Sequence, residues 1–252
     1  MGERHMKIRP IKTEKVLPRS TTIEALLDRS LKRFPENSIL VITSKIVALS
    51  EGRVLPRGTI TENTLRQEAD YYLPAQESRY GVPITIKDNT FIARAGMDNS
   101  NTGGSSSLLP RDSYASARKI RSYLIKRFGL KQAGVIIVDS HSSPLRRGVT
   151  GVAIGWSGFV GLKGYEHVPD IFGKKFTTHA NHVDALATAA SLTMGEANEQ
   201  TPLALITDIP NIAFKASSPT KGELSYFKPP LQDDLFAPLF DYKKLRKGRD
   251  RR

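Results

Sequence analysis

Two acidic segments of this 252-residue chain carry the residue types that bind a divalent cation together with phosphate groups. Asp98 begins the run Asp-Asn-Ser-Asn, and Asp139 is followed by Ser140; each aspartate comes soon after an apolar stretch. Carboxylate, hydroxyl and amide oxygens are the ligands that hard cations such as Mg²⁺ prefer. The alternative for each aspartate alone is a turn or helix cap, the commonest role of Asp in loops. Two such segments in one chain favour a metal–nucleotide site.

Two pairs of residues are candidates for holding anionic groups beside these aspartates. Ser44 and Lys45 follow an apolar run, where a strand passing into a helix leaves free amide donors at the helix start. Arg146 and Arg147 follow the Asp139 segment, and their guanidinium groups could clamp a carboxylate or phosphate. The alternative, which the pattern favours equally, is that these cations simply belong to a solvated basic surface. The chain has neither a Walker motif nor G-x-G-x-x-G, which disfavours a P-loop enzyme or a Rossmann dehydrogenase.

The elements that must position these residues alternate irregularly between strands and helices. Short apolar runs predict buried strands, whereas apolar residues at helical spacing and an alanine-rich run predict helices. Strands are predicted at 7–12, 39–43, 134–138 and 203–207, a hairpin at 82–95, and helices after Thr21, at 64–73, from Asp112 to Phe128 and at 181–194. Without a steady strand–helix repeat, the pattern favours an α+β fold with mixed sheets and flanking helices.

Composition limits the other classes of function. The chain has no cysteine, no signal-peptide pattern and no apolar run long enough to span a bilayer, which predicts a cytoplasmic protein without a membrane-bound part. Its net charge is +13, and residues 243–252 carry seven basic residues and one aspartate. We expect this basic tail to be disordered and to touch nucleic acid only nonspecifically. A non-catalytic, nucleic-acid-associated protein using its basic surface and tail is the alternative function.

Several segments together resemble one known family, the coenzyme F-420-0:L-glutamate ligases, which are γ-glutamyl ligases. Each motif is weak alone, but seven in the same order are fairly specific. They are 43–47 with 51–53, 95–101, 109–110 with 115–118, 138–140, 148–155, 184–187 and 194–196. The resemblance covers residues 8–214, and we therefore expect a ligase domain over 1–214, a C-terminal extension over 215–242 and the basic tail over 243–252.

The resemblance implies an amide ligase that uses GTP, or ATP, and needs Mn²⁺ or Mg²⁺; K⁺ is a further candidate cation. Such an enzyme activates a carboxylate as an acyl phosphate, which the amine of L-glutamate then attacks. The family also implies its own F-420 γ-glutamyl ligase-like fold and an intertwined homodimer. The expected partners are therefore L-glutamate, a small anionic acceptor and a second copy of the chain.

Site residues are carried over from the family position by position. The metal aspartates match Asp98 and Asp139, with the hydroxyl of Ser140 beside the second. Arg146 is assigned to the catalytic set with the two aspartates, as the group that holds glutamate or the acceptor. The nucleotide-binding positions match Ile8, Arg9, Pro10, Ile11, Ser44, Lys45, Asn101, Gly195 and Glu196.

Three positions depart from the family pattern. Leu49 and Ser50 stand where a lysine is usual, and Lys45 could supply that charge from one helical turn away. Glu196 replaces a usual glutamine or lysine, and Leu145 replaces an aromatic residue. The pattern is closer to a bacterial branch of these ligases, so the acceptor is predicted to be coenzyme F-420-like or folate-like. A third hypothesis is a homologue that has lost catalytic activity because its site residues have changed.

Overall fold

The computed structural model describes residues 5–240 and 242–249, which form helices and strands in four sheets. The strands are β1 (Lys7–Ile11), β2 (Ser38–Thr43), β3 (Val54–Pro56), β4 (Tyr71–Leu73), β5 (Ile84–Lys87), β6 (Thr90–Ala93), β7 (Ser105–Ser107), β8 (Ala133–His141), β9 (Thr150–Ser157), β10 (Leu162–Gly164), β11 (His179–Asn181), β12 (Leu203–Thr207) and β13 (Arg246–Lys247). The α-helices are α1 (Ile23–Ser30), α2 (Ser44–Ser50), α3 (Glu62–Glu68), α4 (Ser113–Phe128), α5 (His182–Met194) and α6 (Lys221–Phe227). This mixture of helices and several sheets confirms the α+β class.

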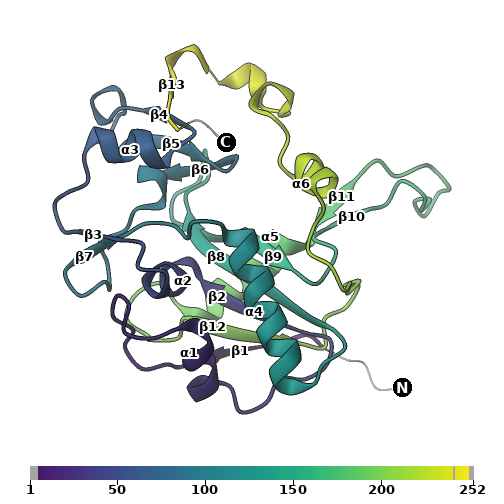
Figure 1. Cartoon of the computed structure of the whole chain (residues 1–252). Coiled ribbons are helices and arrows are strands. Elements are labelled where there is room, and N and C mark those ends of the chain that lie inside the picture. Colours follow the sequence, from purple (N-terminus) through teal and green to yellow (C-terminus); the bar gives the residue numbers. More distant parts are fainter. Residues whose placement is uncertain (1–4, 241, 250–252) are drawn as a thin grey trace.

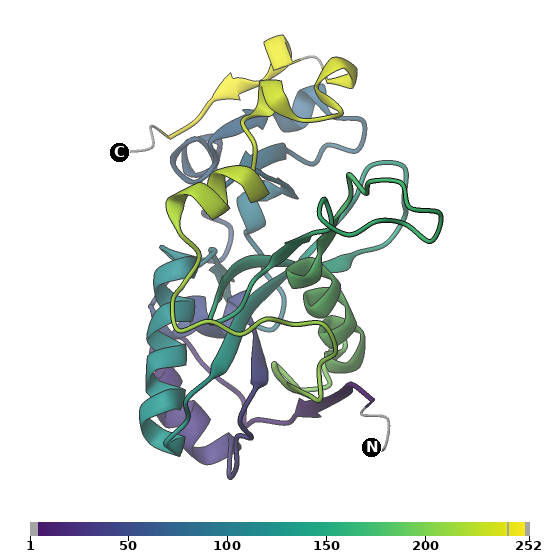
Figure 2. The same ribbon diagram turned by 90° about the vertical axis from the view of Figure 1, so that its right-hand side faces the viewer.

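The large sheet has five strands in the order β1-β12-β2-β8-β9 and is covered on both faces. Only β2 and β8 are parallel; the other neighbours are antiparallel. Figure 2 shows α4 on one side of this sheet and α5 on the other. Because both faces are covered, the central strands are buried almost throughout, which explains why β2 and β8 read as continuous apolar runs rather than as alternating ones.

Alternate residues of each central strand pack into two different cores. Leu40 and Ile42 of β2 pack with α1, α2 and α4, whereas Ile39 and Val41 face α5. Successive side chains of a strand point to opposite faces, so a single apolar run serves both layers. Asp112 caps α4 as predicted, whereas α1 is capped by Thr22, one residue after the expected Thr21; Asn181 caps α5, and each cap acts through its side-chain oxygen.

A second, smaller lobe is built from residues 54–98 and the C-terminal segment. Its sheet has the order β13-β4-β5-β6, and β13 pairs with β4 although more than 170 residues separate them in the chain. Figure 1 shows the C-terminal segment running from the large sheet past α6 to this lobe. The segment leaves the large sheet where Phe214 bridges Phe159, and it reaches the small lobe where Asn89 donates to the carbonyl of Pro229 at 2.6 Å. The described residues after 214 therefore contact both the large sheet and the small lobe.

The basic tail differs from the expected disordered segment over the residues that are described. Arg246 pairs with Glu62 at 3.0 Å and Glu77 at 2.8 Å, and Arg249 pairs with the buried Asp70 at 3.0 Å. A run of basic residues in a sequence is usually interpreted as a solvated tail. The acidic partners of these arginines lie far away in the sequence, so the run itself gives no sign of them. Residues 250–252 of the predicted tail lie outside the described residues.

One local expectation is corrected by the small lobe. The helix predicted over 64–73 ends at Glu68, and residues 71–73 form β4 because they pair with β5. A further short strand, β7, pairs with β3 over Ser105–Ser107. No helix within the described ranges is long and apolar enough to cross a membrane.

Candidate active site

The candidate site begins where the parallel ladder between β2 and β8 ends. Thr43 and Val138 are its last partners, so Ser44, which starts α2, and Asp139, which continues β8 beside β9, lie next to each other at this edge. Ser44 Oγ donates a hydrogen bond to Asp139 Oδ1 at 2.5 Å. Carboxyl ends of parallel strands are the common place for ligand sites in such sheets, because the following turns diverge and leave a crevice. Two of the residues assigned to the site from the sequence are thus in direct contact.

Asp98 reaches this edge from the small lobe, in the loop after β6. Lys45 Nζ donates to Asp98 Oδ2 at 2.6 Å and also contacts the carbonyl and hydroxyl oxygens of Ser100 at 2.9 and 2.8 Å. The Ser100 amide and hydroxyl donate to the Asp98 carboxylate at 2.7 and 2.8 Å. Burial opposes ionisation of Asp98, but the hydrogen bonds from Lys45 and Ser100 outweigh it and hold its pKa below the usual value.

Asp139 has the opposite electrostatic character. Burial of its carboxylate raises its pKa to about 6, the hydrogen bond from Ser44 offsets part of that shift, and the charge of Asp98 raises it further. The two carboxylates are therefore close enough to repel each other, with Lys45 compensating mainly Asp98. An additional cation at this edge would relieve that repulsion.

The loop after α5 closes another side of the site. Ser140 Oγ donates to Glu196 Oε2 at 2.7 Å, and Asn101 Nδ2 donates to the carbonyl of Ala197 at 2.7 Å. Gly195 ends α5 with φ +82, and a Cβ there would lie 2.3 Å from the Glu199 carboxyl carbon, so glycine allows this turn. Thus Asn101, Ser140, Gly195 and Glu196, distant in sequence, are brought together.

Other predicted residues lie outside this cluster. Ile8, Arg9, Pro10 and Ile11 lie on the edge strand β1, paired with β12, and no contact joins their side chains to Asp98 or Asp139. Ile8 and Ile11 belong to the two apolar cores, which gives them a structural role in this chain. Arg146 and Arg147 are exposed in the loop between β8 and β9, and within the described part of the chain the Arg146 guanidinium hydrogen-bonds the Leu145 carbonyl alone, at 3.0 Å.

The donor set fits a cation that is also held by substrate phosphates. Within the described residues, no three His, Cys, Asp or Glu side chains group closely enough to enclose a metal ion. Mg²⁺ usually binds through one or two carboxylates plus phosphate oxygens and waters, so a full protein cage is unnecessary. The two aspartates, with the hydroxyls of Ser44 and Ser140, supply oxygen ligands of the right kind.

One residue of the cluster escaped the sequence analysis. Ser100 bonds both Asp98 and Lys45, and the Asp-x-Ser spacing, typical of an Asx turn, was the available signal. Lys45 was predicted to touch phosphate, but in this structure its ammonium is held by Asp98 and Ser100. A phosphate arriving here would find this cation already positioned at the site.

Comparisons with known proteins agree on one family. A family model described as F420-0:Gamma-glutamyl ligase matches residues 10–208. The chain is 34% identical over 211 residues to the coenzyme F420:L-glutamate ligase of Methanococcus maripaludis strain C6, covering 76% of this chain and 84% of that protein. It is 31% identical over 210 residues to the protein of the same name from Archaeoglobus fulgidus, covering 77% and 84%.

The protein of that name from Methanocaldococcus jannaschii is 32% identical over 199 residues, covering 71% of this chain and 80% of that protein. The range matched by the family model spans both aspartate segments and Lys45 in the first turn of α2. The chain therefore belongs to the F420-0:gamma-glutamyl ligase family and is a ligase enzyme.

Proposed function

We propose that this enzyme uses GTP and a divalent cation, Mn²⁺ or Mg²⁺, to join L-glutamate to a coenzyme F420-type acceptor. One observation carries the proposal: Asp98 and Asp139 meet beside Ser44 and Lys45 at the edge of the large sheet. Two carboxylates, a lysine and helix-start amides are the groups that a nucleotide triphosphate with its cation requires. The family match and the named activity of the relatives support the glutamate-ligating part.

In this proposal the protein side chains mainly bind and orient the reactants. Lys45 would hold a phosphate as a point charge, helped by the amide donors at the start of α2. Asn101 and Glu196 would border the nucleotide from the loop after α5. Asp98, Asp139 and Ser140 would hold the cation, which when bound neutralises charge on the phosphates during phosphoryl transfer.

The proposed reaction has two balanced steps. An oxygen of the acceptor carboxylate attacks the γ-phosphorus of GTP, the bond to the β-phosphate oxygen breaks, and GDP leaves an acyl phosphate behind. The amine of glutamate then attacks the acyl carbon, phosphate leaves, and the amine loses a proton as the amide forms. Because the pKa of Asp139 is about 6, its carboxylate is mostly ionised at neutral pH. It can therefore serve as a charged ligand or accept a proton.

An assay with mass detection tests this function. The enzyme is incubated with L-glutamate, Mn²⁺ and GTP, and in separate arms with coenzyme F420-0, an F420 already carrying glutamate, or a folate. We expect one glutamyl unit to be added to an F420-type acceptor, with GDP and phosphate released in equal amounts. Parallel arms with ATP, with Mg²⁺ and with added K⁺ identify the nucleotide and ions. If no acceptor gains glutamate and no nucleotide is consumed, the proposal is wrong.

We further propose that the enzyme is a homodimer in which the β10–β11 arm contacts the partner. This arm projects from the large lobe (Figure 1), and at its tip Ile171 is 92% and Phe172 83% exposed. Apolar side chains grouped on a projecting segment are typical of a protein contact. Light scattering after size exclusion should give twice the chain mass of 27.9 kDa, and the Ile171→Asp/Phe172→Asp variant should give a monomer. A wild-type monomer at micromolar concentration would exclude the dimer.

A further inference from the structure

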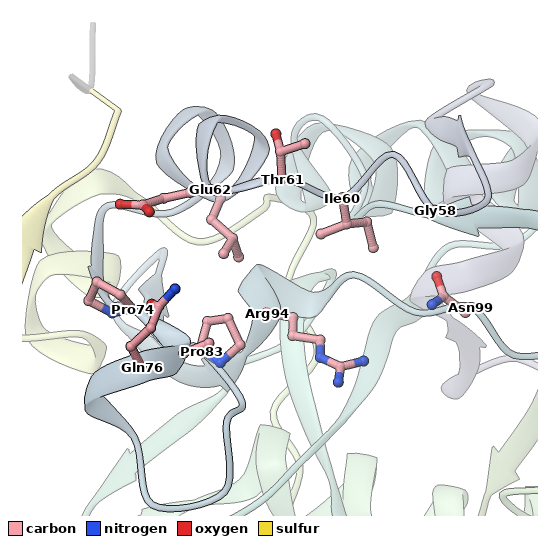
Figure 3. Close-up of a pocket in the computed structure, with 11 residues that line it drawn as sticks. Gly58, Ile60, Thr61, Glu62, Pro74, Gln76, Pro83, Arg94 and Asn99 are labelled. Carbon is pink, nitrogen blue, oxygen red and sulfur yellow. The ribbon is translucent and has the colours of Figure 1, made fainter.

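A pocket of about 380 Å³ lies in the small lobe, beside the loop that carries Asp98. Figure 3 shows it between the chain around α3 and the turn that carries Arg94. Its wall is largely apolar, and Asn99, the neighbour of Asp98, is one of its lining residues. Apolar lining residues are Ile60, Leu65, Pro74, Ala75 and Pro83. A cavity of this size, mostly apolar with a few polar groups, is typical of a site for a small organic molecule.

Arg94 is held at the pocket by an uncommon backbone conformation. Arg94 and Ala95 have φ of +53 and +52, and Gly96 has +75, so three successive residues are left-handed. The Ala95 amide donates to the fully buried Thr85 hydroxyl at 2.7 Å, which fixes the turn. A Cβ on Gly96 would lie 2.6 Å from Leu109, so this position needs glycine. Non-glycine residues rarely adopt this region, and such turns persist where the surrounding structure enforces them.

The Arg94 guanidinium is available for a ligand. Among the described residues the Arg94 guanidinium has no hydrogen bond or ion pair to a protein group, and in Figure 3 its side chain extends toward the Asn99 end of the pocket. The one acidic residue of the lining, Glu62, is already paired with Arg246 at 3.0 Å and with the Tyr72 hydroxyl at 3.3 Å. The pocket therefore combines an apolar wall with one uncompensated positive charge.

We infer that this pocket binds the acceptor, with its planar part against Ile60 and Pro83 and an anionic group on Arg94. Arg94 and Asp98 are four residues apart, so their Cα atoms lie within about 14 Å of each other. An acceptor held by Arg94 can thus extend its reacting carboxyl past Asn99 to the carboxylate cluster. A guanidinium suits this role because it pairs with a carboxylate or phosphate through two parallel hydrogen bonds. This inference rests on the proposed function and assigns specificity for the acceptor to Arg94.

The test is Arg94→Gln with coenzyme F420-0 as the acceptor. We expect the KM for F420-0 to rise about 10- to 100-fold, as for loss of a charge-assisted hydrogen-bonded pair. The KM values for GTP and glutamate, and kcat at saturating acceptor, should stay within about twofold. Arg94→Lys should recover part of the loss, because it restores the charge without the two-point geometry. Arg33→Gln is the matched control, an exposed arginine on the large lobe, and should change nothing.

A second variant tests the pocket itself without changing its charge. Ala75→Trp places a bulky ring in the cavity and should also raise the KM for F420-0, with an unchanged melting temperature as proof of folding. Unchanged acceptor KM in both variants, while wild type turns over F420-0, overturns the pocket assignment alone. A rise confined to the KM for GTP would place the nucleotide here and also overturn it. Wild type that adds no glutamate to F420-0 contradicts the proposed function instead.

Discussion

Asp139→Asn should lower ligase turnover by about 10³-fold or more while the protein stays folded. Asparagine keeps the size of the side chain, and its carbonyl oxygen can still accept the hydrogen bond from Ser44. The substitution removes one of the two charges that would hold the cation and the nucleotide phosphates. Initial rates of GDP release at saturating GTP and Mn²⁺, for wild type and variant, measure the loss. Full turnover by the variant would remove Asp139 from the active site.

The same variant should be more stable than wild type at neutral pH when EDTA is present. Burial raises the pKa of Asp139 to about 6, above its value of about 3.9 in the unfolded chain. The folded state therefore binds the proton more tightly, and wild type loses stability as the pH rises from about 4 to 6. The gain for the variant is zero below pH 4 and at most about 3 kcal/mol above pH 6, less because the residue is partly exposed.

Chemical denaturation at pH 4, 6 and 8 measures this difference. Asp233→Asn is the control, since Asp233 is an exposed aspartate of the C-terminal segment, and this substitution should change neither turnover nor stability. A variant that loses activity and also unfolds at lower denaturant at pH 8 would mean that the Asp139 charge stabilises the fold. That result would contradict the raised pKa.

Glu68→Ala should destabilise the protein by about 3–5 kcal/mol. Glu68 receives two hydrogen bonds from Arg53, at 2.8 and 2.7 Å, and one from Lys87 at 2.6 Å. Lys87 is 3% exposed, so the variant leaves its ammonium group buried without this partner. Removing one member of a buried ion pair costs far more than removing both, because the remaining charge stays desolvated. Urea unfolding at pH 7 gives the free energy directly.

Two comparisons separate this effect from a general loss of charge. Glu14→Ala removes the exposed pair with Arg29 and should cost less than about 1 kcal/mol. Lys87→Met in the Glu68→Leu background removes both buried charges and should restore much of the lost stability. If Glu68→Ala costs no more than Glu14→Ala, the network contributes little to folding. Because Arg53 also donates to the Leu109 carbonyl, the network ties α3 to the segment preceding α4.

The sequence determined the large sheet and one half of the site. Local patterns were sufficient there: apolar runs identify β2 and β8, and side-chain caps identify the helix starts. Once the two strands are parallel neighbours, Ser44 and Asp139 must lie at the same edge, because each directly follows a member of the last ladder pair, Thr43 and Val138. The family motifs carry the same information, since they lie in these turns.

The other half of the site depended on contacts between residues far apart in the chain. Asp98 meets Lys45 only because the small lobe folds back on α2, and no spacing rule predicts an ion pair across 53 residues. The C-terminal cations read as a solvated tail because charge is evident in a sequence but its partners are not. Arg94 also lacked a signal, since its left-handed turn is fixed by Thr85 on the neighbouring strand. Side-chain periodicity determines which face of an element is buried, whereas tertiary packing decides which charges end up facing one another.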